Sequence, residues 1–182
     1  MSTLALPTGL RLPANQKGLG SVIQKPDTAD LIPGVSIHPL AIHPDDRGYF
    51  LEAARLGKGA VKEFPVTSQV SVAASYTGTI KAFHYHQKQF DYWVPVQGAL
   101  QVALADLRSD SPTFGLRNTL YIGTLRPWGL VIPPGVAHGY KVISPDSAVL
   151  VYLTSQHYDP GDEGRIPYDD PGIHYDWEIQ HK

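Results

Sequence analysis

The stretch GTIKAFHYHQKQFDYWVPVQG, residues 78–98, decides the fold prediction because it combines strand-like alternation with a dense group of polar side chains. His84 and His86 stand one residue apart, so both side chains point to the same face if the chain is extended here. Asp91 follows five residues after His86, and Gly98 closes the run at a turn. The whole sequence has only eight histidines, so this pair marks a candidate site on a β-strand.

The strand face that carries the two histidines can be predicted from alternation. Ile80, Ala82, His84 and His86 should share it, and the small Ala82 would leave room for a ligand. Taken alone, this face fits a metal site, a catalytic base with its neighbour, or a polar patch on a sheet.

The rest of the chain consists of short runs rich in Val, Ile, Leu and Tyr, which turn residues separate at roughly 8–12 residue intervals. No long apolar stripe has the 3.6-residue period of a helix. One run should place Leu100, Val102 and Leu104 on a single face, and a later run pairs Tyr152 with Leu150 in the same way. The pattern predicts an all-β sandwich or barrel.

The length of 182 residues fits one domain with a buried core, so we expect residues 1–182 to form a single domain. Proline and glycine make residues 1–20 a loose N-terminal arm, either flexible or swapped between subunits of a dimer. Residues 56–64 should form one or two helical turns. Residues 158–182 are turn-rich and should wrap the outside of the domain.

Composition excludes several functional classes. The net charge of −2 argues against non-specific nucleic-acid binding, which needs a basic surface. The absence of cysteine excludes disulfides, cysteine-ligated zinc and thiol catalysis. No run approaches the ~18 consecutive apolar residues of a membrane span, and the N-terminus lacks the pattern of a signal peptide. We therefore expect a cytoplasmic protein that binds neither membrane nor nucleic acid.

The spacing of glycines, histidines and acid within residues 78–98 resembles the first cupin motif, with Asp91 where metal cupins usually carry glutamate. Residues 133–138, PPGVAH, resemble the core of the second motif and supply His138. This resemblance implies a cupin double-stranded β-helix, a jelly-roll barrel whose interior can hold a ligand. Three imidazoles and a carboxylate inside such a barrel can bind a metal ion with open positions. The ligands of that alternative are His84, His86, Asp91 and His138.

A longer resemblance spans residues 45–177 in four ordered blocks. They are DDRGYFLE (45–52), DLRSDSPTFG (106–115), VIPPGVAHGY (131–140) and YDPGDEGRIPYDDPGIHYDW (158–177). The blocks resemble the dTDP-4-dehydrorhamnose 3,5-epimerase family. The resemblance implies a homodimeric cupin isomerase that acts on nucleoside-diphosphate 4-keto-6-deoxy sugars, without metal or organic cofactor, in cell-envelope polysaccharide synthesis.

The chemistry of that family requires a base, an acid and oxyanion donors, because a proton next to the C4 ketone is removed and then returned to the opposite face. The resemblance implies that His84 is the base and Tyr152 the acid. Histidine suits the first role because its ordinary pKa lies near neutral pH. The implied substrate contacts are Arg47, Glu52, Gln69, Lys81, His86, Asp91 and His138. Trp93 or Tyr92 would be available to stack on a ring.

The sequence also departs from the family. Lys81 and Ala82 stand where the family has Arg-Gly, and Asp91 aligns with the lysine near the keto oxygen. The aspartate that orients the family's base belongs to a C-terminal extension with no counterpart up to Lys182. We expect His86 and Asp91 to form a hydrogen-bonded pair that tunes the base in its place. That pair should raise the pKa of His86, because a nearby carboxylate favours imidazolium.

The predicted function is therefore sugar-nucleotide epimerisation by proton abstraction and return at C3, C5 or both. Three alternatives stay open at this point. The paired histidines also resemble those of sugar-nucleotide 3,4-ketoisomerases. A metal-dependent cupin enzyme would use the four ligands named above. A non-catalytic carbohydrate-binding cupin would keep the pocket without the reaction.

Overall fold

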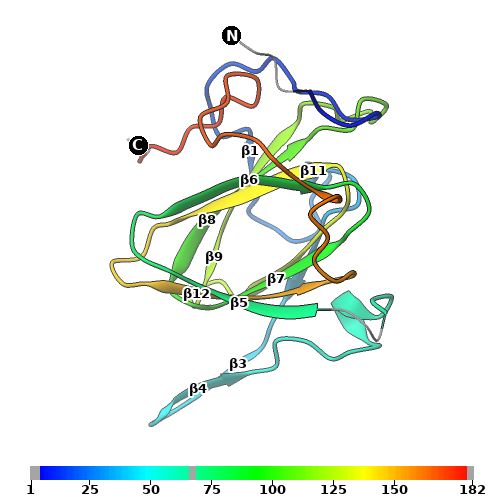
Figure 1. The fold of residues 1–182 in the computed structure, drawn as a ribbon. Coiled ribbons are helices and arrows are strands. Elements are labelled where there is room, and N and C mark those ends of the chain that lie inside the picture. The colour runs from blue at the N-terminus through cyan, green and yellow to red at the C-terminus, as the bar shows by residue number, and fades with distance from the viewer. Residues whose placement is uncertain (1–4, 66–68, 180–182) are drawn as a thin grey trace.

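The computed structural model describes residues 5–65 and 69–179, and it consists of two facing, mainly antiparallel sheets that enclose a core (Figure 1). The five-stranded sheet has the order β2 (Ser36–Pro39), β10 (Trp128–Ile132), β7 (Asp91–Gln97), β12 (Ala148–Thr154) and β5 (Gln69–Ser75). The six-stranded sheet has the order β1 (Ser21–Val22), β9 (Arg117–Gly123), β8 (Ala99–Asp106), β11 (Val136–Val142), β6 (Ile80–His86) and β13 (Glu163–Arg165). The predicted all-β class is confirmed.

Strands β5 to β8 alternate between the two sheets, and so do β9 to β12. Such crossing between two layers is typical of a jelly-roll barrel, in agreement with the predicted architecture. A separate hairpin of β3 (Ile42–Asp45) and β4 (Gly48–Leu51) projects away from the five-stranded sheet (Figure 1). The helical turns expected near residues 56–64 amount to one short 3-10 helix, η1 (Gly59–Val61).

The main hydrophobic core lies between the two sheets. Leu100, Val102 and Leu104 all belong to it, which confirms the face predicted from their alternation. Leu150 of β12 meets them from the opposite sheet. Burial of this apolar surface is the dominant favourable term in folding, so the core holds the two sheets together.

The outer face of the six-stranded sheet is covered by both ends of the described chain. Phe83 and Tyr85 of β6 pack there against a second buried cluster that includes Tyr175 and Trp177 of the C-terminal tail. The N-terminal arm joins the same surface, where Arg11 donates its amide to the carbonyl of Leu107 over 2.8 Å. The tail thus wraps the outside as expected, and it also adds an unforeseen strand, β13, to the edge of the sheet.

Strand β6 contains an irregularity that alternation alone did not predict. Its pairing with β11 joins His84 to His138 but Lys81 to Tyr140, so β6 carries one extra residue in this interval. Such a β-bulge turns the side chains before it to the other face.

Within the described residues, no helix has the length and apolar character needed to cross a membrane.

Candidate active site

A cavity of about 360 Å³ lies between the two sheets. Seven of the nine residues predicted as catalytic or substrate-binding line it, and they come from strands of both sheets. These seven are Gln69, Lys81, His84, His86, Asp91, His138 and Tyr152. The pattern of alternation in β12 is confirmed, because Leu150, Tyr152 and Thr154 all face this cavity.

The bulge in β6 changes which residues share the cavity with the histidines. We expected Ala82 beside His84 on this face, and that expectation is wrong. Lys81 lines the cavity instead, whereas Ala82 packs against the cluster on the outer face of the sheet. The bulge therefore brings a cationic side chain to the wall that holds His84 and His86.

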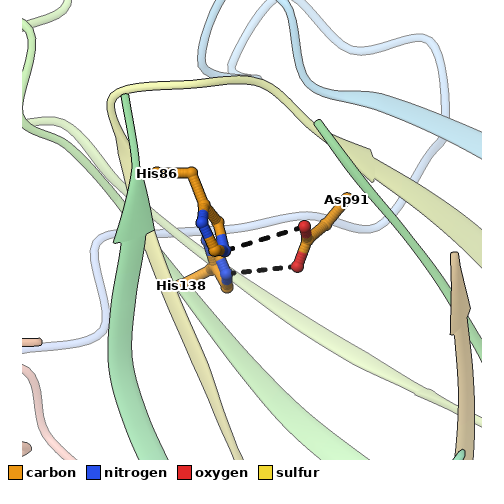
Figure 2. A group of neighbouring side chains, drawn as sticks. All are labelled: His86, Asp91 and His138. Atoms are coloured by element: carbon orange, nitrogen blue, oxygen red, sulfur yellow. Dashed lines mark ion pairs between the residues drawn. The ribbon is translucent and has the colours of Figure 1, made fainter. Parts of the chain in front are cut away.

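Asp91 lies at the centre of a buried polar group with two histidines (Figure 2). Its Oδ1 lies 3.8 Å from Nε2 of His86, and its Oδ2 lies 3.5 Å from Nε2 of His138. The two imidazole rings stack on each other with centroids 5.7 Å apart. We expected His86 and Asp91 to form a hydrogen-bonded pair, but at 3.8 Å the two atoms form an ion pair and not a hydrogen bond. Asp91 lies closer to His138, at 3.5 Å, and its ion pairs among the described residues do not include His84.

Further hydrogen bonds hold this group in place. The amide nitrogen of Gln89 lies 2.8 Å from Oδ1 of Asp91 and 3.2 Å from Nε2 of His86. The indole of Trp93 donates to Oδ2 of Asp91 over 3.2 Å. Nδ1 of His138 lies 2.9 Å from the carbonyl of Val136, which fixes the proton on Nδ1 because a carbonyl only accepts.

These atoms have the composition of a metal site. His86, Asp91 and His138 each offer a ligand atom, and the three atoms lie within 4.8 Å of one another. Two histidines with one carboxylate suit a divalent transition metal. However, both carboxylate oxygens and the Nε2 of His86 already have hydrogen-bond partners within the protein. His84 is not part of this three-residue group, so the four-ligand set inferred from the sequence does not assemble among the described residues.

The predicted pKa of His86 is wrong in direction. Burial lowers the pKa of His86, and the favourable charge of Asp91 only partly opposes that effect. Burial also raises the pKa of Asp91, but its hydrogen bond and charge interaction with His138 outweigh this and leave the pKa below its ordinary value. The sequence-based argument considered the carboxylate and omitted the cost of charging an imidazole away from water.

His84 faces a different carboxylate. Its Nδ1 lies 3.5 Å from Oε1 of Glu163 in β13, and Nε of Arg165 donates to the same oxygen over 2.8 Å. Burial and the charge of His138 lower the pKa of His84 to about 4, although Glu163 acts in the opposite direction. Sequence reasoning assigned no role to Glu163 or Arg165. Both stand in the fourth block of the family resemblance, DEGR, which was the available signal.

Arg47 and Glu52, the remaining predicted substrate contacts, do not line this cavity. Arg47 lies in the turn of the projecting hairpin and pairs with Asp45 over 2.5 Å, with 83% of its side chain exposed. Glu52 follows β4 and pairs with Arg55 over 2.6 Å. A single copy of the chain thus keeps these two residues apart from the histidines.

Comparison with protein families matches residues 30–182 to the family described as dTDP-4-dehydrorhamnose 3,5-epimerase. Among curated proteins, the spore coat polysaccharide biosynthesis protein SpsL of Bacillus subtilis is 43% identical over 152 residues. That alignment covers 82% of this chain and 99% of SpsL.

Solved structures of similar proteins have the same fold. A dTDP-6-deoxy-D-glucose-3,5-epimerase from Legionella pneumophila, in complex with dTDP-4-keto-L-rhamnose, is 27% identical with a TM-score of 0.70, and the match covers 81% of this chain and 80% of that one. The 3'-monoepimerase ChmJ of Streptomyces bikiniensis, in complex with dTDP-quinovose, is 32% identical with a TM-score of 0.69, covering 78% and 74% of the two chains.

Proposed function

Because this chain belongs to the dTDP-4-dehydrorhamnose 3,5-epimerase family, we propose that it epimerises a nucleoside-diphosphate 4-keto-6-deoxy sugar at C3, C5 or both. The observation that carries the proposal is a histidine and a tyrosine on opposite walls of one cavity. His84 comes from the six-stranded sheet and Tyr152 from the five-stranded sheet. A sugar ring between them would present one face to each side chain, as inversion of a carbon requires.

The reaction follows from the substrate's own ketone. Loss of a proton from C3 or C5 gives an enolate whose charge is delocalised onto the C4 oxygen. His84 removes that proton, and Tyr152 returns one to the opposite face. Because the pKa of His84 is lowered to about 4, its imidazole is neutral at pH 7 and free to accept a proton. Among the described residues that line the cavity, Lys81 and Arg165 have cationic side chains, which can stabilise the negative charge on the enolate oxygen.

The test is solvent exchange. The purified protein is incubated in D₂O with dTDP-, UDP- or GDP-linked 4-keto-6-deoxyglucose, and deuterium at each carbon is followed by NMR. We expect deuterium at C3, C5 or both, with inversion. A product whose carbonyl has moved to C3 would identify a ketoisomerase instead. A protein that exchanges neither proton in any of the three substrates would be a carbohydrate-binding cupin without this activity.

We also propose that the reaction needs no metal or organic cofactor, because the ketone already serves as the electron sink. The second candidate is a metal-dependent cupin enzyme, which the convergence of His86, Asp91 and His138 favours. Elemental analysis should find well under one divalent ion per chain, and EDTA should leave the exchange rate unchanged. Stoichiometric zinc, nickel, manganese or iron that Asp91→Asn removes would place the metal enzyme first.

A homodimer would explain how Arg47 and Glu52 of the hairpin can contact a substrate although they do not line the cavity of their own chain. We propose that the hairpin of one subunit reaches the cavity of its partner and brings Arg47 and Glu52 to the nucleotide. Apolar surface is available for such contact, since Phe50 is 66% exposed and Val70 and Val72 of edge strand β5 are 60% and 65% exposed. Light scattering should give twice the chain mass. A monomer at micromolar concentration would contradict this proposal.

We also propose that the protein is cytoplasmic. Recovery of the protein from a membrane fraction would contradict that location.

A further inference from the structure

Glu163 is the carboxylate that faces the proposed base. Its side chain is only 14% exposed, and its Oε1 lies 3.5 Å from Nδ1 of His84. Arg165 donates from Nε to that same oxygen, which orients the carboxylate. The other buried carboxylate of the cavity, Asp91, pairs with His86 and His138. Among the described residues, the recorded ion pair of His84 is therefore the one with Glu163.

The pairing of β13 with β6 places this carboxylate. The two strands are antiparallel, with Glu163 opposite His86 and Arg165 opposite His84. Glu163 thus reaches His84 along the diagonal, a distance that a long side chain can span between neighbouring strands. Beyond the strand end, Phe83 and Ile166 exchange two backbone hydrogen bonds of 2.8 and 3.0 Å, which fix the register.

The close approach of β13 depends on a glycine. A Cβ added at Gly164 would overlap the ring of Tyr85, which is buried on the outer face of β6. Without a side chain at this position, β13 lies flat against its neighbour and its two polar side chains turn into the cavity. The sequence DEGR therefore has the residues needed to deliver a carboxylate to His84.

A carboxylate at one imidazole nitrogen determines where the proton resides. When Nδ1 donates to an oxygen, Nε2 is left with its lone pair. The titratable and charged groups that face His84 are Glu163, Arg165, His86 and His138. Of these, only Glu163 has oxygen acceptors. The distance of 3.5 Å exceeds that of a strong hydrogen bond, but such bonds tighten when substrate closes a site.

We infer that Glu163 is the positioning residue of His84, holding the proton on Nδ1 so that Nε2 accepts the proton from C3 or C5 of the sugar. This inference rests on the proposed epimerase function. The carboxylate itself touches no reacting atom. Its role corresponds to that of the aspartate which orients histidine in acyl-transfer triads, here supplied from a neighbouring strand.

The tautomer can be measured without substrate. Histidine side-chain ¹⁵N spectra at pH 7.5, with His84→Gln used for assignment, should show His84 protonated on Nδ1 in the wild type. Glu163→Ala should move the proton to Nε2. Asp159→Asn is the matched control: it removes a carboxylate from the same cavity, but its recorded side-chain contact is the amide of Gly161, so the tautomer should not change. Protonation of Nε2 in the wild type would overturn the inference.

Kinetics provides the second readout. Glu163→Gln keeps the side-chain shape and should lower kcat for exchange by on the order of 10–100-fold with little change in KM. Glu163→Asp should recover part of the loss. An unchanged kcat would overturn the inference even where the tautomer is as expected. Absence of exchange in the wild type would overturn the proposed function instead, and the tautomer measurement distinguishes these two failures.

Discussion

Asp91 carries a negative charge in the cavity, and its neighbours determine where that charge acts. Gln89 and Trp93 donate to its two oxygens, and the imidazole of His138 lies beside it. Both oxygens of the carboxylate thus accept hydrogen bonds from the protein inside the cavity. A substrate oxygen would meet Lys81 on the wall, while the charge of Asp91 is already engaged by its own hydrogen-bond donors. An acid at this position is compatible with enolate chemistry for that reason.

Replacement of His84 by alanine should abolish proton exchange at C3 and C5 while nucleotide-sugar binding persists. The base acts in the transition state, whereas affinity should come mostly from contacts to the nucleotide. Deuterium incorporation and calorimetric titration measure the two properties separately. A variant that still exchanges either proton at the wild-type rate would show that another group is the base.

Replacement of Tyr152 by phenylalanine should leave proton abstraction measurable and remove the return of a proton to the opposite face. We therefore expect solvent exchange without net inversion, or inversion at one carbon only. NMR of the recovered sugar gives both quantities in one spectrum. Equal rates of inversion in variant and wild type would reduce Tyr152 to a packing residue.

Sequence reasoning named the side chains of the cavity but not their partners. His84, His138 and Tyr152 were identified because their spacing follows a family pattern. Glu163 was not, since its contact with His84 joins strands 79 positions apart in the sequence. The pKa of His86 was misjudged for a related reason, because the depth of its burial depends on elements the local sequence does not show.

Among the strands, β8 and β12 follow the predicted alternation of side chains, whereas β6 does not. Regular strands β8 and β12 have the predicted faces, because each residue advances the chain by a fixed step. The bulge in β6 breaks that count between Lys81 and His84. At this bulge the partner strand has Gly139, which packs closely against Ala82.

Gly139→Ala should destabilise the protein and weaken substrate binding through Lys81. A Cβ there would stand 2.7 Å from both the Cα of Ala82 and the carbonyl oxygen of Lys81, and backbone atoms cannot move aside easily. We expect a loss of about 1–3 kcal/mol in the free energy of unfolding, measured with urea. Gly18→Ala is the control, since its Cβ would meet only Arg117 at 3.7 Å. Equal stability of both variants would contradict the close contact.

For the whole molecule, acid should weaken the fold well before carboxylates are protonated. The pKa of His84 falls from 6.5 to about 4 on folding, and burial lowers the pKa values of His86 and His38 as well. The unfolded chain therefore binds more protons than the folded one between these values, so stability is lost as pH falls from 6.5 towards 4. Urea midpoints should decrease over this range, and His84→Gln should flatten the decrease. If the urea midpoint of His84→Gln decreased with pH as steeply as that of the wild type, the loss of stability would come from other groups.

The aromatic cluster that covers the outer face of β6 also has a consequence for folding during synthesis. Phe83 and Tyr85 leave the ribosome long before Tyr175 and Trp177, which shield the same face in the finished molecule. Until Tyr175 and Trp177 emerge, the nascent barrel exposes an aromatic surface, and before residue 163 is made it also lacks the strand that carries Glu163. Partly folded chains with exposed apolar surface are prone to aggregate. A nascent chain should therefore remain incomplete and prone to aggregate until residues 163–177 have been synthesised.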